Sequence, residues 1–219
     1  MRLFCISDIH GHAKALDRVL AVGRARGCTK VLVAGDLCFP GPEPLLTWKL
    51  ITASHAHCVQ GLADRAVAVL DADRLQASTD HERERIDALR RCRSELGQVI
   101  LARLERLPKT FRMATEDGGE LLLVHGAPED PTVSMTLDMP DAELAELLGD
   151  EPAEVVVCGG SHGPFDRTVG TTRIVNVGSV GEGPEGFAHA TVIATSPAGI
   201  EVEQLLIPLG MAVQEPQAG

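Results

Sequence analysis

Five carboxylate and imidazole side chains in this sequence each follow a short apolar segment. They are Asp8 and His10 after residues 2–7, Asp36 after 30–34, His125 after 120–124 and His162 after 155–158. Imidazole nitrogens and carboxylate oxygens together form a borderline donor set, which suits Mn, Fe, Zn, Co or Ni better than Ca. One Asp-x-His pair is common by chance. Five such side chains at the ends of apolar segments predict a metal centre.

Strand-like and helical patterns alternate along the first half of the chain. The predicted strands there are 2–7, 30–34 and 57–60, and the predicted helices are 13–25, 42–54 and 80–107. The second half reads as strands at 120–124, 155–158, 174–177, 190–194 and 200–207, with one helix at 140–148. This alternation predicts an α/β fold in which βαβ units build a sheet covered on both faces. Ligands of such sheets collect at the carboxyl ends of the strands, so we expect the five side chains to share one crevice.

A chain of 219 residues fits one α/β domain. We place that domain at residues 1–210, because no internal repeat divides it. The Pro-, Gln- and Gly-containing end, 211–219, is expected to be a C-terminal tail.

Composition disfavours several classes of partner. The formal net charge of −11 repels long nucleic acids and anionic lipid surfaces. The apolar runs are far shorter than the roughly 20 residues that a membrane span needs. The N-terminus lacks a secretory signal and the six cysteines are scattered, which predicts a cytoplasmic protein with reduced thiols.

Six motifs distributed along the chain carry a family resemblance. They are SDIHG at 7–11, AGD at 34–36, QGLAD at 60–64, VHG at 124–126, GGSH at 159–162 and NVGSVG at 176–181. In order and spacing the sequence resembles the calcineurin-like metallophosphoesterases, in particular the small bacterial and archaeal phosphodiesterases. The resemblance implies a central two-sheet β-sandwich flanked by helices. It also implies hydrolysis of phosphomonoesters or phosphodiesters by metal-activated water at a two-metal centre.

The resemblance also assigns the metal ligands, and two of them are replaced. It implies that Asp8, His10, Asp36 and His162 hold the first divalent transition metal. The second metal would use Asp36 and His125, together with an Asn and a His whose positions are taken here by Leu62 and Gly160. Two protein ligands hold a divalent ion poorly. We therefore expect one occupied metal site, a second site that is empty or weak, and reduced activity.

Asp64 and His125 are the candidate catalytic residues that the resemblance implies. Ala63 stands where many relatives have the His that assists the leaving group, whereas Asp64, its usual partner, remains. His12, two residues beyond His10, is one candidate for restoring the second metal site. The alternative interpretation of His12 is a structural role near a helix start.

Three interpretations of function follow. The first is a metal-dependent phosphoesterase that acts on a small phosphorylated substrate with a depleted second metal site. The second is a catalytically silent homologue that binds a ligand or regulates a partner, so the sequence leaves enzymatic activity open. The third is a structural or interaction protein with relic ligands. The third is disfavoured because buried acids and imidazoles without a metal cost stability.

Overall fold

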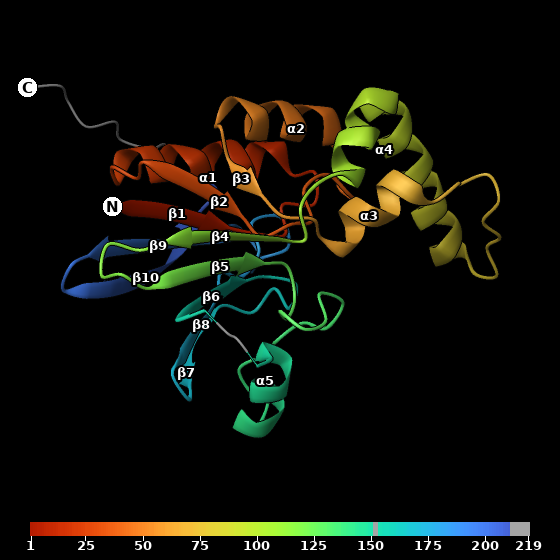
Figure 1. Ribbon diagram of the computed structural model, residues 1–219. Helices are drawn as coiled ribbons and strands as arrows, with labels where there is room; N and C mark the ends of the chain where they lie inside the picture. The colour runs from red at the N-terminus through yellow and green to blue at the C-terminus, as the bar shows by residue number, and fades with distance from the viewer. Residues whose placement is uncertain (151–152, 211–219) are drawn as a thin grey trace, which may run out of the picture.

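Two five-stranded β-sheets form the centre of the computed structural model, which describes residues 1–150 and 153–210 (Figure 1). The first sheet has the order β10 (Gly199–Pro208), β9 (Phe187–Ser196), β1 (Arg2–Ile6), β2 (Lys30–Val33) and β3 (His57–Cys58). The second has the order β4 (Thr110–Ala114), β5 (Glu120–Val124), β6 (Val155–Cys158), β8 (Thr172–Asn176) and β7 (Phe165–Val169). The predicted two-sheet sandwich flanked by helices is confirmed.

Each sheet contains a set of three parallel strands. Strand β1 pairs in parallel with β2, and β2 with β3, while β5, β6 and β8 form a parallel set in the other sheet. Antiparallel strands complete both sheets, β9 and β10 in the first and β4 and β7 in the second. The carboxyl ends of the parallel strands therefore lie at one end of each sheet, which is where ligands of α/β sheets bind.

Alternate residues of the central strands serve two different hydrophobic cores. Leu3 and Cys5 of β1 pack with Leu121 and Leu123 of β5 in the layer between the sheets. Phe4 of β1 faces the other way, toward the helices. Because both faces of these strands are buried, their sequences read as continuous apolar runs rather than as an alternation.

Helices cover the outer faces of the sandwich. They are α1 (Ala13–Ala25), α2 (Pro44–Ala53), α3 (Leu62–Val69), α4 (Asp80–Glu105) and α5 (Asp141–Leu148). Helices α1 and α2 lie over the first sheet, α3 and α4 pack against each other beyond its end, with α4 also against α2, and α5 packs on the second sheet (Figure 1). At the start of α4 the Thr79 hydroxyl accepts a hydrogen bond from the Glu82 backbone, and the Glu82 carboxylate reaches back to the Thr79 amide. This reciprocal cap fixes the first turn of the helix.

The structure adds elements that the sequence patterns did not predict. Helix α3 spans only eight residues, which is too short for a helical period to stand out from the sequence, and it leaves Leu62 and Val69 exposed. Strand β7 has Asp166, Arg167 and Thr168 in succession, so it contains no apolar run. Strand β4 alternates polar and apolar residues, but only over five positions. The helix predicted at 80–107 is interrupted at Gly97, whose φ of 69° lies in the left-handed region.

The limits of the described chain bear on two expectations. Strand β10 ends at Pro208, and the predicted tail, 211–219, lies outside the described residues. The single domain at 1–210 therefore remains a prediction. No helix in the part of the chain that the structure describes is both long enough and apolar enough to cross a membrane.

Leu104 on α4 tests the core between the helices and the first sheet. Its side chain is fully buried, whereas Val99 on the same helix is 71% exposed. We expect Leu104→Ala to lower the free energy of unfolding by about 2–5 kcal/mol, because it removes buried methyl groups and leaves a cavity. Val99→Ala should change it by less than about 0.5 kcal/mol. Urea denaturation of both variants measures the difference, and equal losses would contradict this packing.

Candidate metal centre

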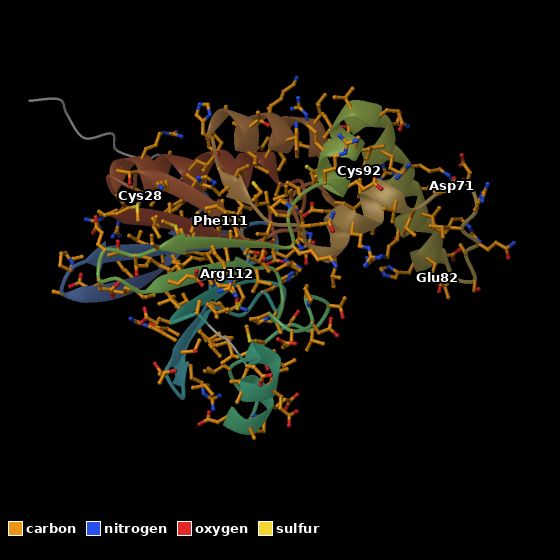
Figure 2. All side chains as sticks on the ribbon, in the orientation of Figure 1. Cys28, Asp71, Glu82, Cys92, Phe111 and Arg112 are labelled. Carbon is orange, nitrogen blue, oxygen red and sulfur yellow. The ribbon has the colours of Figure 1, made fainter. Side chains whose placement is uncertain are left out.

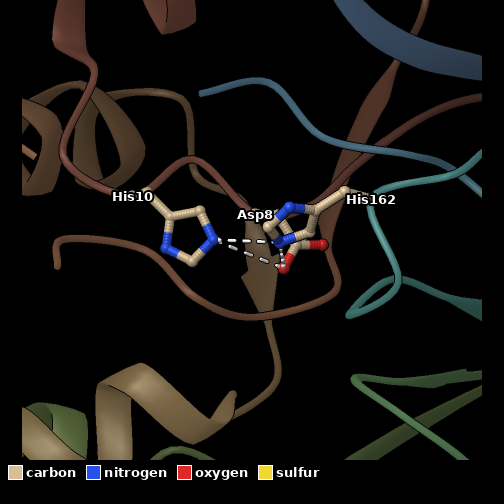
Figure 3. Close-up of side chains that lie close together, drawn as sticks. All are labelled: Asp8, His10 and His162. Carbon is tan, nitrogen blue, oxygen red and sulfur yellow. Dashed lines mark hydrogen bonds and ion pairs between the residues drawn. The ribbon is translucent and has the colours of Figure 1, made fainter. Parts of the chain in front are cut away.

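Asp8, His10 and His162 bring their donor atoms together beyond the ends of β1 and β6 (Figure 3). His162 Nε2 lies 3.3 Å from Asp8 Oδ1 and 3.2 Å from His10 Nε2, and His10 Nε2 lies 3.7 Å from Asp8 Oδ1. Ligands held about 2.1 Å from one ion at angles between 90° and 109° are separated by about 3.0–3.4 Å. The two shorter distances fall in this range and the third is slightly longer, so the three side chains fit a common metal ion.

Asp8 also belongs to a second group of potential ligands, with Asp36 and His125. The donor atoms of this group all lie within 4.8 Å of one another, and His125 Nε2 is 3.5 Å from Asp36 Oδ2. Asp8 and Asp36 follow strands of the first sheet, whereas His125 follows a strand of the second. The structure therefore brings all five predicted ligands into one cluster. Asp8 is common to both groups. The bridging role that the resemblance gives to Asp36 remains a prediction.

Each of the three histidines has a partner for Nδ1. Nδ1 of His10 lies 2.7 Å from the Phe39 carbonyl oxygen, and Nδ1 of His125 lies 2.7 Å from that of Ala34. A carbonyl oxygen can only accept, so in both rings Nδ1 carries the hydrogen and the Nε2 lone pair faces the cluster. Nδ1 of His162 lies 3.3 Å from Glu182 Oε2. Such partners fix the tautomer and the orientation of metal-binding imidazoles.

The carboxylate of Asp8 is fully buried, and one of its oxygens has no hydrogen-bond partner. Oδ2 accepts a hydrogen bond from the Gly160 amide at 2.9 Å, while Oδ1 has no such partner among the described residues. Burial raises the pKa of Asp8, but the imidazoles of His162, 3.3 Å from Oδ1, and of His125 outweigh burial and bring it below its usual value. An ionised buried oxygen needs a positive charge beside it. The donor set thus fits a divalent ion.

Four of the five predicted ligands have an unusual backbone conformation. Asp8, His10, Asp36 and His162 have φ values of 52°, 51°, 54° and 59°. Among the described residues only one other non-glycine residue, His55, has a positive φ. Left-handed conformations cost such residues about 1 kcal/mol or more each and cluster at functional sites. The concentration of strain at these four positions independently marks the cluster.

Asp64 holds the loop that presents Asp36. Its Oδ2 accepts hydrogen bonds from the amides of Asp36 and Gly61, and its Oδ1 accepts one from the Leu37 amide, all at 2.9 Å. Burial, followed by the charge of Asp36, raises the pKa of Asp64 to about 6. Its carboxylate is used to position backbone, and a catalytic role for Asp64 remains a prediction.

The replaced positions lie next to the cluster. Leu62 begins α3 with 43% of its surface exposed, and the amide of the following Ala63 donates to Asp36 Oδ1 at 2.8 Å. At Gly160 a Cβ atom would lie 3.5 Å from His125 Nε2. Both positions therefore border the half of the cluster that contains Asp36 and His125.

His12 and Glu182 are the two remaining residues of interest near the cluster. His12 belongs to neither group of donor atoms within the described residues, and it precedes α1 without a side-chain capping bond. Glu182, which sequence reasoning missed, contacts His162. It follows the NVGSVG motif directly, so its place in the chain was the available signal.

The calcineurin-like phosphoesterase superfamily domain matches residues 1–196 of this sequence. The chain belongs to this superfamily. The resemblance carried by the six motifs is therefore confirmed at that level. No curated protein matches the sequence significantly.

Several solved structures of this superfamily's fold are similar to the chain. A hypothetical protein from Pyrococcus horikoshii OT3 is 19% identical, with 94% of this chain and 88% of that chain covered and a TM-score of 0.79. A metallophosphoesterase from Sphaerobacter thermophilus is 22% identical, with 94% and 89% covered and a TM-score of 0.70. An archaeal phosphodiesterase is 15% identical, with 94% and 100% covered and a TM-score of 0.54. At these identities the similarity shows the shared fold.

Proton competition should make metal binding depend on pH. The carboxylate of Asp8, 3.3 Å from Nε2, raises the pKa of His162. Burial lowers the pKa of His125, but the charges of Asp36 and Asp8 outweigh it and the net shift is upward. A protonated imidazole cannot bind a metal. The affinity for Mn²⁺ should therefore rise with pH through the raised histidine pKa values and level off above them.

Calorimetric titration with Mn²⁺ in buffers of different ionisation enthalpy measures both the affinity and the protons released. We expect the number of protons released per bound Mn²⁺ to be largest at the lowest pH studied, where the histidines are protonated before the metal binds. A pH-independent affinity without proton release would contradict this prediction.

Proposed function

We propose that this superfamily member is a metal-dependent phosphoesterase that hydrolyses small phosphorylated substrates at the cluster of Asp8, His10, Asp36, His125 and His162. The observation that carries the proposal is the buried carboxylate of Asp8, one oxygen of which accepts no hydrogen bond from the described residues and which is shared by two groups of metal-capable side chains. The metal ion bound by this cluster would be Mn, Fe, Zn, Co or Ni, in keeping with its mixed nitrogen and oxygen donors.

Different side chains of the cluster would hold the metal ion and accept a proton. When bound, a divalent ion lowers the pKa of a water and neutralises charge on a phosphoryl oxygen. Asp8, His10 and His162 would hold that ion, with His10 fixed by the Phe39 carbonyl. His125 presents the Nε2 lone pair and has its Nδ1 hydrogen engaged by a backbone carbonyl, so it can accept a proton or a hydrogen bond only at Nε2.

A depleted second site is part of the proposal. Leu62 offers no ligand atom, and Gly160 has no side chain, so the second half of the cluster retains Asp36 and His125 with a share of Asp8. Phosphoester hydrolysis with two ions clamps both the attacking and the leaving oxygen. Reduced activity follows if the second ion is weakly held. A cytoplasmic location remains a prediction.

A direct test combines metal analysis with hydrolysis of an aryl phosphodiester and an aryl phosphomonoester in the presence of Mn²⁺. We expect protein purified without chelator to contain a transition metal and to release the aryl alcohol. Asp8→Ala should lower the rate by about 100-fold or more, because it removes the shared ligand and charge stabilisation worth several kcal/mol. Asp17→Ala, at an exposed position on α1, is the control and should match the wild type.

Metal binding without hydrolysis would instead favour the silent, ligand-binding homologue. Exposed Leu62 at the edge of the cluster is the observation that supports this second candidate.

Restoring the two replaced ligands should raise activity. Leu62→Asn returns an amide oxygen beside Asp36, and Gly160→His directs an imidazole toward His125, because its Cβ would lie 3.5 Å from His125 Nε2. The positive φ of Gly160, 75°, costs a histidine some strain, and the Ser134 hydroxyl, 2.7 Å from the new Cβ, must rotate. We expect each single variant to gain little and the double variant to gain at least tenfold, a strongly non-additive result.

Rates with added Mn²⁺ for the wild type, both single variants and the double variant measure this gain. Thermal unfolding of each variant shows whether the strained substitution still folds. A wild type as fast as a folded double variant would show that Leu62 and Gly160 do not limit activity.

A further inference from the structure

An apolar groove lies between α3 and the first half of α4. Its volume is about 350 Å³, and Phe39, Ala66, Leu70 and Leu75 line it together with polar residues that include Glu82. In Figure 2, Glu82 marks this region at the edge of the molecule, near the N-terminal end of α4. Pockets of about 300–1,000 Å³ are usual for small ligands. The groove is therefore large enough for part of a small molecule.

Helix α3 connects this groove to the metal centre. Leu62, Ala66 and Leu70 are spaced four residues apart, so they form one stripe along the helix. The stripe begins next to Ala63, whose amide binds the carboxylate of Asp36. It ends at Ala66 and Leu70 in the groove. Helix α3 therefore runs from the loop that holds Asp36 to the wall of the groove.

Phe39 makes the connection from the other side. Its carbonyl oxygen accepts the Nδ1 hydrogen bond of His10, while its side chain lines the groove. The two halves of the same residue therefore contact the metal centre and the groove.

The walls of the groove are fixed and partly exposed. Leu70 and Leu75 are 39% and 37% exposed. Arg93 of α4 donates hydrogen bonds to the carbonyls of Val67 and Ala68, which holds the end of α3 against α4. Clustered exposed apolar side chains mark binding surfaces. The groove has a fixed wall, and both Phe39 and α3 contact the metal centre as well as the groove. These features favour a site for part of the substrate over a packing defect.

We propose that the substrate is a phosphate ester whose alcohol portion is an apolar alkyl or aryl group seated in this groove. This inference rests on the proposed phosphoesterase function. Water attacks phosphorus, the bond between phosphorus and the alcohol oxygen breaks, and the alcohol leaves with a proton derived from that water. The groove binds the alcohol portion while the phosphoryl group lies at the metal centre.

The test uses n-alkyl phosphates from methyl to hexyl as substrates, with release of inorganic phosphate as the readout. The matching n-alkylphosphonates, which are not hydrolysed, measure binding to the Mn²⁺-loaded protein by calorimetry. We expect both kcat/KM and affinity to rise with each methylene, up to about fourfold, the equivalent of about 0.8 kcal/mol.

Two variants change the groove, one in its volume and the other in its polarity. Ala66→Phe fills it, and Leu70→Gln makes its wall polar, so both should flatten the dependence on chain length. Val99→Phe adds the same ring at an exposed position in the other half of α4 and should keep the wild-type dependence. Thermal unfolding confirms that each variant folds.

The outcomes separate the groove from the activity. Hydrolysis without any dependence on chain length would overturn the proposed role of the groove in substrate binding. It would leave the proposed phosphoesterase function supported. The opposite result is an affinity for phosphonates that rises with chain length, an effect lost in Ala66→Phe, with no hydrolysis of the phosphates. It would support binding of an apolar group in the groove and overturn the proposed phosphoesterase function. Light scattering that shows a dimer dissociated by Ala66→Phe would assign the groove to a second copy of the chain and overturn the proposal.

Discussion

The buried carboxylate of Asp8 is the feature on which the arrangement of the site depends. It lies where loops from both sheets meet, with one oxygen bound by the Gly160 amide and the other without a hydrogen-bond partner among the described residues. The neighbouring His10 and His162 can offset its charge only by taking up protons, which removes their lone pairs as ligands. A cation offsets the charge and uses those lone pairs. The local electrostatics therefore favour metal binding over an internal ion pair.

Close approach of backbone to the carboxylates determines how the ligands are presented. A Cβ atom at Gly61 would lie 2.1 Å from Asp36 Oδ1, and one at Gly159 would lie 2.6 Å from Asp8 Oδ2. These two positions accept no side chain without movement of the loops. The hydrogen bonds from the amides of Asp8 and His10 to the loop after β2 then hold the backbone in its left-handed conformation. The site geometry is thus set mainly by backbone, with Asp64 as its principal side-chain support.

The sequence predicted the ligands better than the elements around them. Asp8, Asp36 and His125 could be found because each follows a strand buried on both faces, and burial leaves a clear apolar signature. Helix α3 could not, because its apolar residues are spread between the core and the groove. The partner of His162, Glu182, and the sharing of Asp8 between both groups depend on how the two sheets dock. That docking is decided by side-chain packing between residues distant in sequence, which no local pattern encodes.

Ligands from both sheets give the metal centre a mechanical role. His10 and His162 are separated by 152 positions in the chain, yet their Nε2 atoms are 3.2 Å apart. An ion bound to both would act as a reversible cross-link that closes a loop of that length. In the chain-entropy description, a cross-link over a loop of more than 100 residues restricts the unfolded chain by an amount comparable to about 4–5 kcal/mol. Loading with metal would then fasten the two sheets to each other, and its loss would loosen the whole sandwich rather than one loop.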